Sequence, residues 1–207
     1  MGGAKIMTKL SQVSLVFDGK PVIDQLSYSF PDKGIFAIMG PSGCGKTSLL
    51  RLLAGLEQPS TGNVMRSHHR VAVAFQEPRL LPWLNCEENL KLVLSEVENM
   101  PKTVSYWLEA LELTEAAKQL PNTLSGGMQQ RLSLARALAF GGDLLLLDEP
   151  FSALDRPLKE RIAPRIKAVA QQALVILVTH DREEAELLSA TVLNCIGTPL
   201  RALEKDE

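Results

Sequence analysis

The feature that most constrains this chain is one short stretch, Gly40-Pro41-Ser42-Gly43-Cys44-Gly45-Lys46-Thr47. It matches the spacing G-x-x-x-x-G-K-[ST], in which glycines let successive backbone N–H groups turn toward a phosphate chain. Lys46 adds a positive charge for the β- and γ-phosphates, and the hydroxyl of Thr47 can ligate Mg²⁺. The stretch, extended by Ser48, therefore predicts a binding site for a nucleoside triphosphate.

The alternative is an accidental glycine-rich turn, and the flanking residues argue against it. Residues 34–39 read as a buried strand that runs into the loop, and residues 46–54 read as a helix ended by Gly55 and Pro59. Such a helix directs its positive end at the same anion.

Composition narrows the class of protein. A chain of 207 residues with 45% hydrophobic and 22% charged residues suits one globular domain. Its net charge is -2 without a long basic run, so nothing favours a nucleic-acid partner. The three scattered cysteines predict a reducing compartment, with neither a disulfide framework nor a zinc site. Because no membrane-spanning apolar run or signal peptide is visible, we expect a cytoplasmic chain.

Further apolar runs predict a layered α/β fold. Residues 71–75, 144–147 and 174–178 are nearly continuous apolar runs, which is typical of parallel strands covered on both faces. Residues 10–30 read as a β-hairpin, with Val13, Leu15 and Phe17 on one face. The expected fold is a P-loop NTPase (RecA-like) core with an N-terminal antiparallel part and an inserted helical subdomain.

The helices are expected between and after these strands. Residues 87–140 show a helical pattern that we expect to break at Pro101 and Pro121. Another helix is expected from Arg156, and Pro164 should kink or interrupt it. The predicted division is a nucleotide-binding core of residues 1–77 and 141–207, with residues 78–140 as the helical subdomain.

A second nucleotide signature is the acidic pair that follows the run 144–147. Asp148 and Glu149 would lie at the carboxyl end of a core strand, the edge where open α/β sheets bind ligands. Asp148 is then a candidate for Mg²⁺, and Glu149 for deprotonating the attacking water. A strand-capping turn is about as common for such a pair alone, so the interpretation depends on the phosphate loop upstream.

The stretch Leu124-Ser125-Gly126-Gly127-Met128-Gln129-Gln130-Arg131 identifies a family. A serine and two glycines open a helix, so a hydroxyl and backbone N–H groups are free to take an anion, although Ser is also an ordinary N-cap. Here the sequence resembles the ATP-binding cassette (ABC) superfamily, whose signature is Leu-Ser-Gly-Gly-Gln-like. Met128 stands in place of the usual Gln.

The resemblance covers nearly the whole chain and assigns further roles. Phe17 resembles the aromatic residue that stacks on adenine, with a place in the hairpin core as the alternative. Gln76 looks like the glutamine that reaches Mg²⁺ and water. Asp155, in Ser152-Ala153-Leu154-Asp155, looks like the D-loop residue at the dimer interface. His180 looks like the switch histidine at the γ-phosphate.

The resemblance also implies an assembly. In this family two copies pack head to tail, so Ser125, Gly126 and Gly127 of one copy close over the ATP of the other. The signature then takes the place of an arginine finger in stabilising the transferring charge.

Two regions look short beside typical members. Residues 62–71 leave little room for the usual β-hairpin, which puts the antiparallel part in doubt, and little sequence follows residues 191–196. His68 and His69 lie in the first region, where a solvated turn is favoured over a metal site.

Several kinds of ABC protein remain in competition: an importer subunit, an exporter or lipoprotein-release subunit, and a soluble ABC ATPase. The absence of a tandem cassette disfavours the last, and the absence of Asn-Lys-x-Asp disfavours a GTPase. Residues 75–84 closely resemble the nitrate, sulfonate, taurine and thiamine-precursor importers. That likeness implies membrane permease partners docked near residues 76–89, an indirect substrate-binding protein and a position on the inner membrane face. It leaves the substrate undecided.

Overall fold

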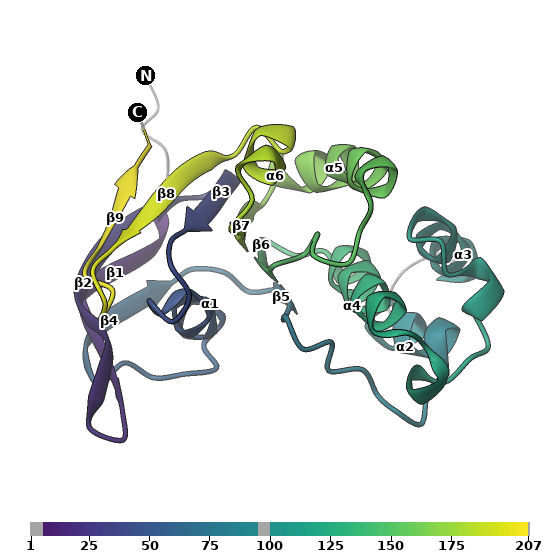
Figure 1. Ribbon diagram of the computed structural model, residues 1–207, viewed down its shortest axis with the longest axis horizontal. Helices are drawn as coiled ribbons and strands as arrows, with labels where there is room; N and C mark the ends of the chain where they lie inside the picture. Colours follow the sequence, from purple (N-terminus) through teal and green to yellow (C-terminus); the bar gives the residue numbers. More distant parts are fainter. Residues whose placement is uncertain (1–5, 95–99, 207) are drawn as a thin grey trace.

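The structure is a computed structural model that describes residues 6–94 and 100–206. Its strands and helices alternate along much of the chain (Figure 1). The strands are β1 (Ile6–Phe17), β2 (Lys20–Pro31), β3 (Gly34–Met39), β4 (Thr61–Arg66), β5 (Val71–Ala74), β6 (Leu144–Asp148), β7 (Leu174–Val178), β8 (Thr191–Ile196) and β9 (Ala202–Lys205). The helices are α1 (Lys46–Ala54), α2 (Cys86–Val93), α3 (Met100–Ala110), α4 (Gly126–Phe140), α5 (Arg156–Ala170) and α6 (Arg182–Leu187).

A six-stranded sheet in the order β5-β6-β7-β3-β8-β9 forms the centre of the molecule. Its first five strands are parallel, and β9 pairs antiparallel with β8. The carboxyl ends of β3, β5, β6 and β7 therefore meet at one edge, as ligand-binding edges of open α/β sheets do. The predicted mostly parallel sheet is confirmed.

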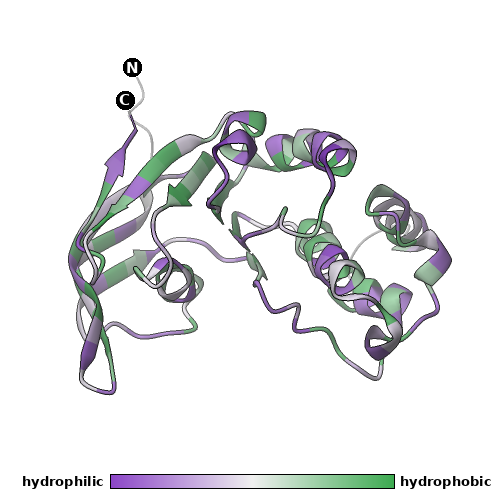
Figure 2. Ribbon diagram, in the orientation of Figure 1, coloured by the Kyte–Doolittle hydropathy of each residue, from purple (hydrophilic) through white to green (hydrophobic). Residues whose placement is uncertain are grey.

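The central strands are apolar on both faces because each face has its own core. On β6, Leu145 and Leu147 pack with α2, α3, α4 and α5, whereas Leu144 and Leu146 pack toward α1 and the antiparallel strands. Figure 2 shows β3 in green, in contrast to the purple of the outer strand β9. Each fully buried leucine stabilises the fold by roughly 2 kcal/mol, which explains why these runs carry almost no polar residue.

A separate three-stranded antiparallel sheet, in the order β2-β1-β4, packs on the α1 side. The sequence left it in doubt whether an antiparallel part forms. The structure shows that it does, because residues 61–66 supply the third strand of this sheet. Gly62 passes a bulge of β1 so closely that a Cβ there would lie 2.2 Å from the carbonyl oxygen of Gln12. Because Gly62 also has a φ of 83°, only glycine suits this crossing.

The helical region lies between β5 and β6 in the chain and forms a lobe to one side of the sheet (Figure 1). Asn85 begins α2 with a capping box, in which its side chain accepts from the N–H of Glu88. The helical pattern is interrupted before Pro101, as expected, since α2 ends at Val93 and Pro101 lies in the first turn of α3, where a missing N–H is tolerated. Pro121 opens a short 3₁₀ turn, 121–123, as its lack of an N–H favours; a second such turn spans 114–116.

Pro164 does not interrupt its helix. The helix α5 continues from Arg156 to Ala170 with Pro164 exposed in its interior, so the expected interruption is wrong. Ile162, Ala163 and Ile166 on the same helix are buried in the core, and this packing outweighs the hydrogen bond that proline cannot donate.

Pro164→Ala is therefore expected to raise the free energy of unfolding by about 1–2 kcal/mol, since alanine restores an N–H and removes the ring from the helix interior. Pro157→Ala is the matched control, because Pro157 occupies the first turn, where an N–H has no helical partner. Urea denaturation of both variants measures the difference. A stability change at Pro164 no larger than that at Pro157 would contradict the expectation.

Within the described residues, no helix is both long and apolar enough to cross a membrane. Cys44, Cys86 and Cys195 are free and buried.

Candidate ATP-binding site

The phosphate-binding loop connects β3 to α1 at the carboxyl edge of the sheet. Gly45 precedes the helix with a φ of 109°, and a Cβ there would lie 2.9 Å from the carbonyl oxygen of Val22. This glycine is therefore required both by its backbone conformation and by the close approach of β2. Lys46 Nζ donates to the carbonyl oxygens of Gly40 and Pro41, each at 2.8 Å, so the ammonium lies over the loop.

Beneath the loop, Cys44 is fully buried and neighbours Cys195 of β8. Burial, together with the Cys44 thiol, raises the pKa of Cys195 to about 12. Cys195 therefore remains a protonated, effectively apolar side chain at neutral pH and supports the loop by packing. No sequence pattern singled out Cys195 or Val22 as part of this site.

A hydrogen bond between Thr47 and Asp148 joins the phosphate-binding loop to the acidic pair at the end of β6. The hydroxyl of Thr47 donates to Asp148 Oδ2 at 2.8 Å across 101 residues of sequence. Asp148 is only 4% exposed, and burial raises its pKa, with the Thr47 hydrogen bond opposing that shift. A hydroxyl and a carboxylate so arranged are oxygen ligands of the kind that Mg²⁺ prefers.

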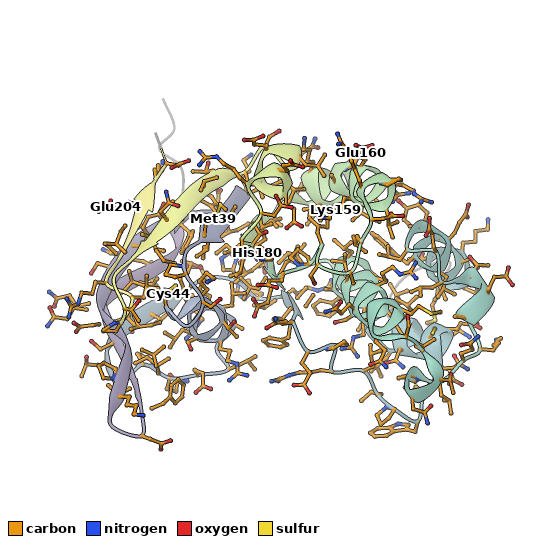
Figure 3. All side chains as sticks on the ribbon, viewed as in Figure 1. Met39, Cys44, Lys159, Glu160, His180 and Glu204 are labelled. Atoms are coloured by element: carbon orange, nitrogen blue, oxygen red, sulfur yellow. The ribbon has the colours of Figure 1, made fainter. Side chains whose placement is uncertain are left out.

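Glu149 follows Asp148 in an unusual backbone conformation, with a φ of 50°. Its N–H donates to the carbonyl of Val178 at 3.0 Å, and its own carbonyl accepts from Ser152 Oγ at 2.9 Å. These bonds hold the residue at the sheet edge, and His180 Nδ1 lies 3.6 Å from Glu149 Oε1. His180 is exposed near the middle of the molecule (Figure 3).

These residues surround a pocket of about 270 Å³ at the carboxyl edge of the sheet. Of the predicted residues, those that line it are Ser42, Gly43, Gly45, Lys46, Thr47, Ser48, Gln76, Asp148 and Glu149, and Val22 and Val178 complete the lining. Gly40, Pro41 and Cys44 belong to the loop outside this lining, and His180 is connected to it through Glu149. Ammonium, hydroxyl and backbone groups on one side and carboxylates on the other suit a phosphate chain with its cation.

The remaining predicted residues lie outside the pocket. Phe17 is 39% exposed at the end of β1, so its alternative placement in the hairpin core is wrong. Ser125 caps α4 and accepts from the N–H of Met128 at 3.3 Å, while Gly126 is exposed beside it. Gly127 faces Ala153, which places the signature next to the turn that leads to Asp155. Asp155 in turn caps α5.

The segment after Gln76 combines an exposed surface with buried supports. Trp83 is 69% exposed, whereas Leu80 packs against the core. The buried side chain of Asn89 donates to the carbonyl oxygens of Leu81 and Leu84, which fixes the path of the loop. The segment therefore presents an exposed aromatic residue on a loop that buried residues hold in place.

Of the two histidines in residues 62–71, His68 departs from the expected solvated turn and His69 agrees with it. His69 is exposed, but the ring of His68 is buried 3.9 Å from Asp143 Oδ1. No group of three or more potential metal ligands lies together in the described part of the chain.

A phosphate-binding loop on β3, joined to an acid-ended β6 in a parallel sheet, defines a P-loop nucleoside triphosphatase. Residues 23–152 match the family model described as ABC transporter, which is more than half of the chain. The chain belongs to the ABC transporter family, as an ATP-binding subunit and an ATPase.

Relatives agree with this assignment. The chain is 42% identical to aliphatic sulfonates import ATP-binding protein SsuB 2 of Pseudomonas syringae pv. tomato, over 86% of this chain and 77% of the relative. It is 43% identical to the SsuB protein of Granulibacter bethesdensis, over 90% of this chain and 79% of the relative. It is 35% identical to the putrescine transport ATP-binding protein PotG of Escherichia coli, over 90% of this chain and 54% of that relative.

Solved structures give the same fold. The ATP-binding cassette MJ0796, in a dimeric post-hydrolysis state bound to ADP and Pi, is similar with a TM-score of 0.84 and 27% identity. The match covers 97% of this chain and 98% of that one. A second dimeric structure of MJ0796, described as a bacterial ABC transporter cassette, matches with the same values.

Proposed function

We propose that this chain is the ATP-hydrolysing subunit that energises a membrane importer for an aliphatic sulfonate or a similar small anion. The observation that carries the catalytic part is the contact of Thr47 with Asp148 beside Lys46 and Glu149 in one pocket. The import part is supported by residues 75–84 and by the names of the relatives.

In the proposed mechanism the loop amides and Lys46 hold the phosphates of ATP, and Phe17 provides an exposed aromatic face for adenine. Thr47, Asp148 and Gln76 would hold Mg²⁺, which neutralises charge on the β- and γ-phosphates when bound. Glu149 is the general base that takes the proton of the attacking water. His180, through its position beside Glu149, contacts the γ-phosphate side of the site.

The proposed active unit is a head-to-tail dimer. Ser125, Gly126 and Gly127 do not line the pocket of their own chain, and Ser125 is exposed at the start of α4. In a two-fold dimer these residues would reach the ATP of the second copy, with Asp155 at the interface. The dimeric state of MJ0796 supports this arrangement.

The remaining partners are proposed from the same comparison. They are membrane permease subunits and, through them, a substrate-binding protein, which would place this chain on the inner face of the cell membrane. The exposed Trp83, with Leu81 and Leu84 partly exposed beside it, offers an apolar surface for a permease helix.

The test is reconstitution with the permease encoded by neighbouring genes in proteoliposomes, with uptake of ethanesulfonate, nitrate and putrescine compared. ATP-dependent ethanesulfonate uptake is expected. Uptake of putrescine alone would overturn the substrate assignment, and ATPase activity without association with any permease would favour a non-transport ABC ATPase.

In the same system, Trp83→Glu is expected to leave basal ATPase activity within about twofold and to reduce co-purification with the permease at least tenfold, because a charge cannot be buried against an apolar helix without a partner. Leu56→Glu is the matched control, since Leu56 is 58% exposed in the loop after α1. Full co-purification and uptake with Trp83→Glu would contradict the docking surface.

A further inference from the structure

One buried carboxylate lies outside the nucleotide pocket and close to the histidine of the site. Glu184, on α6, is only 6% exposed although it is acidic. It accepts one hydrogen bond from Thr179 Oγ1 at 2.5 Å and another from Lys159 Nζ at 2.7 Å. A buried carboxylate is costly unless it is paired in this way, so these two bonds fix the position of Glu184.

The same cluster holds the residues on both sides of His180. Thr179 is 1% exposed, and its hydroxyl also accepts the N–H of Asp181 at 3.0 Å. Asp181 Oδ2 lies 3.7 Å from Lys159 Nζ. His180 is therefore the exposed residue between two anchored neighbours. Thr179 is held by Glu184, and Asp181 is held by Thr179 and lies close to Lys159.

Support for this turn also comes from outside the local sequence. The helix α6 has only six residues, and so short a helix is marginal without tertiary support. Lys159 supplies that support from another helix, the first turns of α5, where its N–H donates to the carbonyl of Asp155 at 2.9 Å. Figure 3 labels Lys159 on α5 and His180 nearer the centre of the molecule.

The charges of this cluster reinforce one another. Desolvation lowers the pKa of Lys159, but its bonds to Glu184 and Asp181 outweigh that effect and raise the pKa overall. Lys159 is therefore charged wherever the protein is folded near neutral pH. Lys159 and Glu184 line a separate pocket of about 470 Å³ between α5 and α6, and neither lines the nucleotide pocket.

We propose that Lys159 and Glu184 are positioning residues for ATP hydrolysis, which fix the turn of Thr179 and Asp181 so that His180 stays beside Glu149. The proposal rests on the proposed role of His180. It assigns no contact with ATP to Lys159 or Glu184, so they act on turnover through His180 and not on nucleotide binding.

The experiment compares Lys159→Met, which removes the ammonium, with Lys159→Arg, which keeps a positive donor. Lys159→Met is expected to lower kcat for ATP hydrolysis about 10-fold and to leave KM within about twofold, because small misplacements near a reacting group are costly. Lys159→Arg should restore at least half of the activity. Lys167→Met is the matched control, since Lys167 on the same helix bonds the exposed Ser189 Oγ at 3.1 Å, away from the histidine turn, and the kcat of this variant should be unchanged.

A double-mutant cycle separates positioning from general support of the fold. In a His180→Ala background, Lys159→Met should lower kcat no further, since its effect is lost with the histidine. Additive losses, or a raised KM with kcat unchanged, would overturn the proposal. If Lys159→Met does not fold, Glu184→Gln replaces it, because glutamine keeps the size of the side chain and removes the charge that Lys159 pairs with.

The kcat values of these variants also distinguish this inference from the proposed function. Loss of activity in His180→Ala with wild-type kcat in Lys159→Met and Glu184→Gln would overturn the positioning roles alone. Wild-type kcat in His180→Ala would overturn the role of His180 and the positioning proposal with it. A wild-type chain without ATPase activity would overturn the proposed function itself.

Discussion

Glu149→Gln is expected to bind MgATP with affinity near that of the wild type and to lose ATP hydrolysis by about 10²–10⁴-fold, the usual contribution of a general base. Glutamine keeps the shape of the side chain at the strained position after β6 but cannot take a proton from water. The backbone bonds to Val178 and Ser152 do not depend on the side chain, so the sheet edge should be unchanged.

Phosphate release and ATP binding, measured on the same preparation, check this expectation. Glu204→Gln is the matched control, because Glu204 is exposed on β9, away from the pocket, and should retain wild-type activity. Wild-type turnover in Glu149→Gln would remove Glu149 from the role of base. Loss of binding together with turnover would indicate that Glu149 supports the pocket and does not act on water.

Mixing two inactive chains is expected to restore ATPase activity if the signature acts in trans. Lys46→Ala removes the ammonium over the phosphate loop, and Ser125→Arg places a bulky cation at the exposed start of α4. Each variant alone should fall at least 10²-fold in activity. A mixed dimer contains one pocket with an intact loop and an intact signature, so it should regain a measurable fraction of wild-type turnover.

Tethering the two chains by a flexible linker makes the mixed dimer the dominant species and gives the fairest measurement. The control is a tethered dimer in which both changes lie in the same chain and the other chain is wild type. In the trans arrangement that dimer has no intact site, because each pocket combines one altered part with one normal part. Activity in this control with none in the mixed dimer would show that each chain uses its own signature.

The nucleotide motifs and the sheet core were determined by local sequence. The apolar runs before the phosphate loop and before Asp148 predicted parallel strands, because strands buried on both faces must be apolar throughout. The position of Lys46, Thr47 and Asp148 at one edge then followed from the rule that ligands bind at carboxyl ends of parallel strands. The spacing of the phosphate-loop motif was enough to predict phosphate binding without any knowledge of distant contacts.

Errors arose where tertiary packing outweighed a local rule. Pro164 lies within a continuous α5 because Ile162 and Ile166 are buried on the opposite face, and that burial exceeds the cost of one missing hydrogen bond. Residues 61–66 form an edge strand against β1 although the segment is short and polar, since pairing with a formed strand needs few apolar residues.

Only the tertiary structure brought Lys159 and Glu184 to the histidine turn. In the sequence Lys159 is one basic residue among several on a helix, and Glu184 is one of three acids in residues 182–187. Their meaning depends on burial and on a contact between α5 and α6 across 25 residues, which no local spacing encodes. The sequence by itself predicted which motifs bind nucleotide and determined which strands present them, because those signals are local. The fold decided which side chains hold them in place, because such contacts join elements whose packing depends on the whole core.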